Sequence, residues 1–215
     1  MKLISVIMMI LCIFLTASEA QSAQTSNISD RMYNATMTLP KPWYSPKSKR
    51  PETQDERKLR IRLITDVIKN ETRNSSKLGW YWSDDDLAWA VFVKTWSESG
   101  RFRYSVHSGN WRGDSGRSVC LGQIMNGGNS LVGTSREPTE KCIKTVVKYL
   151  IMHQNRCLKP TSKPSVWTMG TVFSGYGTGY SCSPNVYKRV TTRSGVRKIY
   201  WARQRGWMWW RLRSS

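Results

Sequence analysis

The segment from Ser83 to Gly100 constrains the fold most strongly, because it predicts a helix that is apolar on every side. Ser83 is a suitable N-cap, and the three aspartates of residues 84–86 lie in the first turn, where the helix dipole favours negative charge. Residues 87–93 are all apolar, and Gly100 is a suitable stop. A helix without a polar face is buried at the centre of its domain. We therefore expect the rest of the chain to pack around this helix, with Glu98 at its carboxyl end.

Two amphipathic helices are predicted on either side of this segment. Apolar residues at helical spacing predict one helix from Glu56 to about Asn74 and another from about Thr139 to Arg156. Residues 101–135 are rich in Gly, Ser and Asn, and they predict loops with a short hairpin. The predicted fold class is α+β, mostly α, with a small β or loop segment between helices.

The length of 215 residues allows one well-buried domain with extensions. We divide the chain into a signal peptide (1–20), a polar linker or N-terminal arm (21–56), a folded domain (57–192) and a basic, Trp-rich C-terminal extension (193–215). The second segment is interpreted as a linker because it contains four prolines between residues 40 and 51 and little apolar periodicity.

The first 20 residues have the pattern of a secretory signal peptide. Lys2 precedes the apolar run Leu3–Leu15, and the small residues Ser18 and Ala20 stand where a signal peptidase would recognise them. The run is shorter than the roughly 20 residues that cross a bilayer. We therefore expect the mature protein to begin near Gln21 and to be secreted or periplasmic, at the cell envelope.

Four cysteines follow the predicted signal peptide, namely Cys120, Cys142, Cys157 and Cys182. An even number in an exported protein indicates two disulfides. Cys142 and Cys157 lie in one predicted helix, where a rise of about 1.5 Å per residue would hold them roughly 22 Å apart, and bridged α-carbons lie within about 7 Å. Two pairings remain, and we favour 120–142 with 157–182 over 120–157 with 142–182. No cysteine pair has the close spacing of a zinc site.

The formal net charge is +20, and no Asp or Glu follows Glu140. A chain of this kind is suited to an anionic partner or surface. Since we expect export, anionic envelope polymers fit better than nucleic acid, and no specific nucleic-acid partner is predicted. Residues 193–213 combine four tryptophans with seven basic residues and form the predicted binding region. Alternatively, half of these rings pack on the core.

Four motifs follow one another in an order that is similar to a known enzyme family. They are Glu98-Ser99-Gly100-Arg101-Phe102 with Ser105-Val106-His107-Ser108, Cys120-Leu121-Gly122-Gln123-Ile124, Phe173-Ser174-Gly175-Tyr176-Gly177 and Tyr187-Lys188-Arg189-Val190. Together they resemble the goose-type lysozymes and soluble lytic transglycosylases of glycoside hydrolase family 23. The resemblance covers about residues 83–190, and it implies a lysozyme-like catalytic domain with a closing helix at Tyr187.

Glu98 is the predicted catalytic acid. A carboxylate at the negative end of a buried helix is disfavoured by the dipole and by desolvation, so we expect its pKa to be raised. A glycosidase acid needs that property, because it must hold a proton that it donates to the glycosidic oxygen. The resemblance implies the same role and a lytic-transglycosylase mechanism. In that mechanism the muramyl C6 hydroxyl attacks, Glu98 acts as base, and a 1,6-anhydro product results.

The resemblance also implies substrate-binding residues. The hydroxyl of Ser99 is expected to lie beside the sugar. The side-chain amide of Gln123 is expected to fix the N-acetyl group of the substrate. Either Phe173 or Tyr176 takes the place of a tyrosine in the third motif, and Tyr187 belongs to the fourth.

The predicted function is cleavage of the MurNAc-GlcNAc glycan strand of peptidoglycan by a monomeric enzyme without a cofactor or metal. A hydrolytic muramidase is the alternative, with Asp114, the only acid between Glu98 and Glu137, as a second carboxylate. A non-catalytic, cationic envelope-binding protein and a chitin-acting enzyme are further alternatives. His107 and His153 are expected to have surface or packing roles, because two histidines without a third ligand do not make a metal site.

Overall fold

The computed structural model describes residues 27–38, 52–192 and 195–214. The helices are α2 (Ile28–Thr38), α3 (Gln54–Glu71), α4 (Asp84–Glu98), α5 (Tyr104–His107), α6 (Arg136–Cys157), α7 (Val166–Thr178) and α8 (Trp201–Arg213). Three 3-10 turns, η1 (Ser75–Leu78), η2 (Asp114–Gly116) and η3 (Asn129–Leu131), lie in the connections. The strands are β1 (Ser118–Val119), β2 (Ile124–Met125), β3 (Lys188–Thr192) and β4 (Gly195–Ile199). The fold class is α+β and mostly α, as predicted, and the predicted signal peptide lies outside the described residues.

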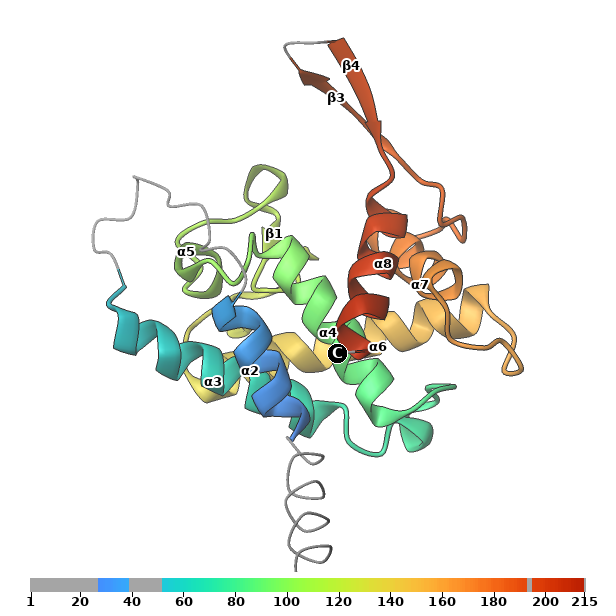
Figure 1. The fold of residues 1–215 in the computed structure, drawn as a ribbon. Coiled ribbons are helices and arrows are strands. Elements are labelled where there is room, and N and C mark those ends of the chain that lie inside the picture. The colour runs from blue at the N-terminus through green and yellow to red at the C-terminus, as the bar shows by residue number, and fades with distance from the viewer. Residues whose placement is uncertain (1–26, 39–51, 193–194, 215) are drawn as a thin grey trace, which may run out of the picture.

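Helix α4 runs through the centre of the molecule (Figure 1), as predicted from its composition. Ser83 and Asp86 form a capping box, in which each side chain accepts a hydrogen bond from the backbone N–H of the other residue. Residues 87–96 are all buried. Helices α3, α6 and α8 pack against α4 and cover its faces.

The flanking helices agree with the predictions within a few residues. Helix α3 begins earlier than predicted because Thr53 and Glu56 form a second capping box. Helix α6 extends three residues beyond the predicted start and one beyond the predicted end. Their predicted core faces are mostly buried, although Leu59 is 73% exposed.

Helix α2 shows that the segment predicted as a linker is partly folded. Met32 is fully buried in the core, and the hydroxyl of Ser29 donates a hydrogen bond to Asp66 of α3. Arg62 of α3 forms an ion pair with Asp30, 2.5 Å apart. The interpretation of all of residues 21–56 as a linker was therefore wrong for the part that forms α2.

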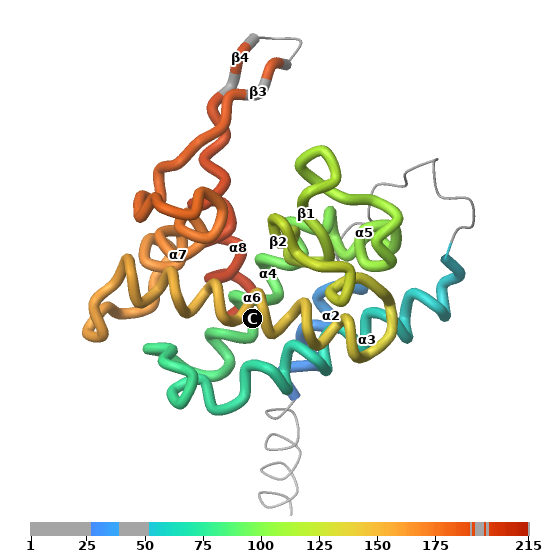
Figure 2. Tube along the Cα trace, turned by 180° about the vertical axis from the view of Figure 1, so that it is seen from behind, coloured from blue at the N-terminus to red at the C-terminus, as the bar shows by residue number. Residues whose placement is uncertain are grey.

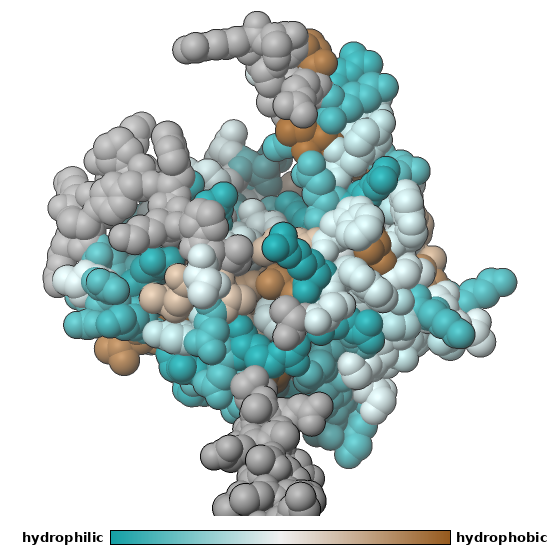
Figure 3. Space-filling model, viewed as in Figure 1, coloured by the Kyte–Doolittle hydropathy of each residue, from teal (hydrophilic) through white to brown (hydrophobic). Residues whose placement is uncertain are grey.

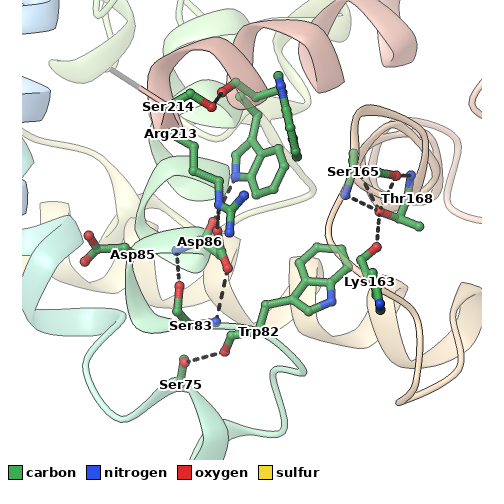
Figure 4. Close-up of polar contacts among 12 residues, drawn as sticks. Ser75, Trp82, Ser83, Asp85, Asp86, Lys163, Ser165, Thr168, Arg213 and Ser214 are labelled. Carbon is green, nitrogen blue, oxygen red and sulfur yellow. Dashed lines mark hydrogen bonds and ion pairs between the residues drawn. The ribbon is translucent and has the colours of Figure 1, made fainter.

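Helix α8 shows that the predicted C-terminal extension is part of the folded core. Trp209 is fully buried and donates a hydrogen bond from Nε1 to the carbonyl of Asp86, 3.0 Å away. Arg213 reaches the carboxylate of the same aspartate (Figure 4). A β-carbon at Gly206 would lie 2.3 Å from the carbonyl oxygen of Val166, so α8 packs closely on α7. The boundary predicted at residue 193 was wrong for this helix.

Two disulfides join Cys120 to Cys142 and Cys157 to Cys182, with α-carbons 6.2 and 5.3 Å apart. This is the favoured pairing. The first ties the β1–β2 hairpin to α6, and the second ties the end of α6 to the segment after α7. Each loop closed in this way is worth about 3 kcal/mol in the chain-entropy model.

Two small antiparallel sheets complete the fold. Strands β1 and β2 form the short hairpin predicted within residues 101–135, with Val119 opposite Ile124. Strands β3 and β4 form a second hairpin that projects from the helical body in both views (Figures 1 and 2). The closing helix implied at Tyr187 was wrong, because residues 188–192 are extended. None of the described helices is both long enough and apolar enough to cross a membrane.

Candidate active site

The carboxylate of Glu98 is held by two cations at the end of α4. Lys94 lies one helical turn earlier, with its Nζ 2.5 Å from Oε1 of Glu98. Arg205 reaches from α8 and places Nη1 2.9 Å from the same oxygen. The Lys94 side chain is 1% exposed, whereas that of Glu98 is 24% exposed. The ion pair is therefore buried at Lys94 and partly accessible from solvent at Glu98.

The turn after α4 fixes the direction of this helix end. Ser99 is fully buried, and its hydroxyl accepts a hydrogen bond from the backbone N–H of Phe102, 2.8 Å away. Gly100, Arg101 and Phe102 all have left-handed backbone conformations, with φ of 61°, 70° and 53°. Ser99 thus stabilises a tight turn and has no exposed surface for the sugar contact that the resemblance implies.

The two cations reverse the expected pKa shift of Glu98. Burial alone raises the pKa of this carboxyl, but the attraction of Lys94 and Arg205 outweighs burial and lowers the pKa below its ordinary value. The prediction of a raised pKa was therefore wrong. The burial of Lys94 lowers its pKa to about 7, against the opposing attraction of Glu98.

Tyr176 lies beside this pair, on α7. The Nζ of Lys94 is 3.8 Å from the centroid of its ring, a cation–π contact. Its hydroxyl donates a hydrogen bond to the carbonyl of Gly122, 3.1 Å away. Burial and the negative charge of Glu98 raise the pKa of Tyr176. Phe173 is fully buried in the core, so of the two aromatic candidates only Tyr176 reaches this site.

The turn between β1 and β2 meets this network at the carbonyl of Gly122, and Gln123 is the next residue. Gln123 donates from Nε2 to the carbonyl of Cys120, 3.0 Å away. A β-carbon at Gly113 would lie 2.1 Å from Oε1 of Gln123, so the end of the glutamine side chain lies against the loop that carries Asp114.

Asp114 is exposed and accepts a hydrogen bond from the hydroxyl of Ser118. It has no described contact with Glu98. Tyr187 is also apart from the site: its ring packs on Tyr200, with centroids 5.7 Å apart, at the base of the β3–β4 hairpin. Of the predicted site residues, the structure connects Glu98 and Tyr176 through Lys94, and the hydroxyl of Tyr176 reaches the backbone of Gly122, which directly precedes Gln123.

The two histidines are buried in the packing of α6. His107 lies 2.9 Å from the hydroxyl of Thr139, and burial together with Arg60 lowers the pKa of His107 to about 3. His153 packs closely on Gly175, and burial lowers its pKa as well. Within the described ranges, no group of three or more His, Cys, Asp or Glu side chains could hold a metal ion.

A groove with a volume of about 870 Å³ lies between α2, the end of α4 and α8. Its lining is aromatic and cationic and includes Trp96, Arg101, Trp207 and Arg211. Trp207 is 55% exposed there, whereas Trp209 is fully buried. The tryptophans of the C-terminal region are therefore divided between surface and core.

No protein-family model, curated protein or solved structure matches the chain. The case for a function therefore depends on the motifs of the sequence and on the geometry of the site.

Lys94 and Arg205 are the site residues that sequence reasoning missed. A signal for Lys94 was present, because a lysine inside an otherwise apolar helix needs a partner, and Glu98 is four residues away on the same face. Arg205 gave no such signal, since it reaches Glu98 only through the packing of α8 on α4.

Proposed function

We propose that the protein is a lytic transglycosylase that cleaves the MurNAc-GlcNAc glycan strand of peptidoglycan, with Glu98 as both acid and base. The observation that carries this proposal is the contact network from Glu98 through Lys94 and Tyr176 to the turn of Gln123. Three motifs far apart in the sequence meet in it. A carboxyl group and a phenol lie close together in this network, and a positioned carboxyl group is what acid–base cleavage of a glycosidic bond needs.

The proposed reaction uses one carboxyl group. Glu98 donates a proton to the glycosidic oxygen, and the bond from that oxygen to C1 of the muramyl residue breaks. The carboxylate of Glu98 then takes the proton of the muramyl C6 hydroxyl, whose oxygen bonds to C1 and closes the 1,6-anhydro ring. No water is consumed. Among the described residues, no second carboxylate contacts Lys94, Arg205 or Tyr176, which favours this route over one that needs two acids.

The proton for the first step must come from the Lys94–Glu98 pair. Glu98 is a carboxylate when both cations are charged, because they lower its pKa. Lys94 donates directly to Oε1, and its pKa of about 7 makes it a weaker holder of a proton than an ordinary lysine. We propose that transfer from Nζ to Oε1 gives a neutral amine and a protonated carboxyl, which is the acid form. Lys94 is thus a positioning residue that shares the proton of Glu98.

A non-catalytic envelope-binding protein is the second candidate. The double ion pair of Glu98 favours it, since a carboxylate locked between two cations can be purely structural. The two disulfides fit export in either case, because such bonds persist in oxidising compartments.

Digestion of purified sacculi, with mass spectrometry of the soluble products, tests the proposal. A transglycosylase releases anhydro-muropeptides, and a muramidase releases products that are one water heavier. Asp114→Asn should change the rate little, because Asp114 lies on an exposed loop. Hydrated products whose formation depends on Asp114 would support the muramidase, and no products at all would favour the binding protein.

A further inference from the structure

The β3–β4 hairpin carries cations on both strands and no acidic residue. Lys188, Arg189 and Lys198 are all exposed. No Asp or Glu occurs anywhere after Glu140, so this part of the chain has no acidic side chain in sequence to neutralise them.

The register places two of these cations directly opposite each other. Arg189 pairs with Lys198 across the two strands, so their β-carbons lie on the same face, about 5 Å apart. Like charges in that position destabilise a sheet. A two-stranded hairpin is only marginally stable in water, so it gains nothing from such a pair. An anion bound across the pair would relieve this repulsion.

The shape of the hairpin makes it accessible. It projects from the helical body in two opposite views (Figures 1 and 2). Lys198 lies over the ring of Tyr187, 4.8 Å from its centroid, which holds the base of the arm together. The three exposed cations thus lie on an accessible, projecting element.

Helix α8 is less suited to bind an anion, although the sequence assigned that role to the whole C-terminal region. Arg205 is paired with Glu98 and Arg213 with Asp86. Arg203 lies over Trp167, 4.7 Å from its ring centroid. These arginines contribute to the fold and the site, whereas Arg189 and Lys198 of the hairpin have no acidic partner among the described residues.

We propose that the β3–β4 hairpin is a binding arm for a linear phosphodiester polymer of the cell envelope, of the polyol phosphate type. A phosphodiester carries one negative charge and two non-bridging oxygens, which can accept from Arg189 and Lys198 together. The arm would hold the protein at the envelope, and this role does not require Glu98 to be catalytic.

A membrane or a nucleic acid fits this arm less well. No Trp, Phe or Leu occurs in residues 188–199 to insert into lipid, and the exposed apolar side chain of Val196 is small. Figure 3 shows a face that is mostly hydrophilic or neutral, with small separate hydrophobic patches. Nucleic acid presents the same phosphodiester charge, but the two disulfides fit an oxidising compartment, which favours an envelope polymer as the partner.

Binding to immobilised poly(glycerol phosphate), measured over a range of salt concentrations, tests the arm. The variant is Arg189→Ser with Lys198→Thr, and the matched control is Lys148→Ser with Lys159→Ser, which removes two exposed cations from another part of the surface. We expect the hairpin variant to bind about tenfold more weakly at low salt. The slope of log K against log salt should fall by about one to two. The control should change less than about twofold. The melting temperature of the hairpin variant should change little, because loss of the contact between Lys198 and Tyr187 opposes the relief of repulsion between the two cations.

Equal weakening in both variants would overturn the proposal, because net charge alone would then explain binding. Tighter hairpin-dependent binding to vesicles of phosphatidylglycerol and phosphatidylcholine, or to duplex DNA at equal phosphate, would overturn it in favour of those partners. Cleavage of short soluble glycan fragments, measured in parallel, should be the same in both variants. A protein that cleaves nothing but binds through the hairpin would refute the proposed function and leave the arm intact.

Discussion

Lys94 and Glu98 form a buried ion pair within one turn of the central helix, with Nζ and Oε1 2.5 Å apart. Each residue decides the protonation of the other: Lys94 lowers the pKa of Glu98, and Glu98 opposes the fall in the pKa of Lys94 that burial causes. A carboxyl group alone at this helix end would behave as the sequence predicted. The ammonium turns it into a two-group proton site, and the proposed chemistry depends on that coupling.

Glu98→Gln should abolish cleavage. Glutamine keeps nearly the same volume but cannot donate or accept the proton, and general acid–base catalysis by one group is worth about 10²–10⁴ in rate. The loss should reach the top of that range, because the same group serves in both steps. Release of muropeptides from sacculi measures it.

The same variant should be less stable, since it leaves Lys94 buried without its carboxylate. Removing one partner of a fully buried pair costs roughly 3–5 kcal/mol, and we expect less here because Glu98 is 24% exposed. Denaturant unfolding separates this effect from catalysis. Substantial residual activity in folded Glu98→Gln protein would contradict the mechanism.

Lys94→Met should change how stability depends on pH. Burial lowers the pKa of Lys94 from 10.5 to about 7 in the folded protein. Between pH 7 and pH 10.5 the unfolded chain therefore binds more protons at Lys94 than the folded protein does. The contribution of Lys94 to the free energy of unfolding thus rises with pH, by about 1 kcal/mol per pH unit. Methionine removes this dependence on pH. Relative to the wild type, the variant should therefore gain most stability at the lower end of this range and least at high pH.

Unfolding by denaturant from pH 7 to pH 10 measures this difference. Lys148→Met, at an exposed position of α6, is the control and should follow the wild type. A constant difference between Lys94→Met and the wild type across this range would show that Lys94 titrates normally.

The central helix could be predicted from the sequence because its signals are local. Ser83 caps it, residues 87–93 lack a polar face, and Gly100 ends it, so no other part of the chain was needed. Four cysteines allow three disulfide pairings, and the length of one helix excluded a bridge between Cys142 and Cys157. The pairing of Cys142 with Cys120 therefore had to be chosen from only two sets of disulfides.

The remaining features depend on tertiary packing. Met32 is the one fully buried apolar side chain of α2, so this helix has too little apolar periodicity to be recognised in a proline-rich context. In α8, arginines alternate with tryptophans, and only the fold decides that Trp209 is inside while Trp207 is outside. The pKa of Glu98 was mispredicted partly because the local signal of Lys94 was missed and partly because Arg205 comes from that helix.

Trp209→Ala should destabilise the protein severely. Its side chain is fully buried between α8 and the start of α4, and its Nε1–H is bonded to Asp86. Truncating a buried tryptophan costs about 3–5 kcal/mol, whereas Trp207→Ala should cost little, since Trp207 is 55% exposed. Thermal unfolding of the two variants checks this. Similar melting temperatures would mean that α8 is a dispensable extension, as the sequence first suggested.

Arg205→Gln should move the basic limb of the pH–rate profile to higher pH. A general acid loses activity as the pH rises through the pKa at which it gives up its proton. Arg205 lowers the pKa of both Lys94 and Glu98. Removing its charge should therefore raise the pKa of the group that holds the proton, whether that group is Lys94 or Glu98. The expected shift is about 0.5–1 pH unit.

The matched control is Arg203→Gln, on the same helix but over Trp167, which should leave the limb in place. If both variants shift the limb equally, the change reflects the overall charge of α8, and the proton then belongs to a group other than the Lys94–Glu98 pair.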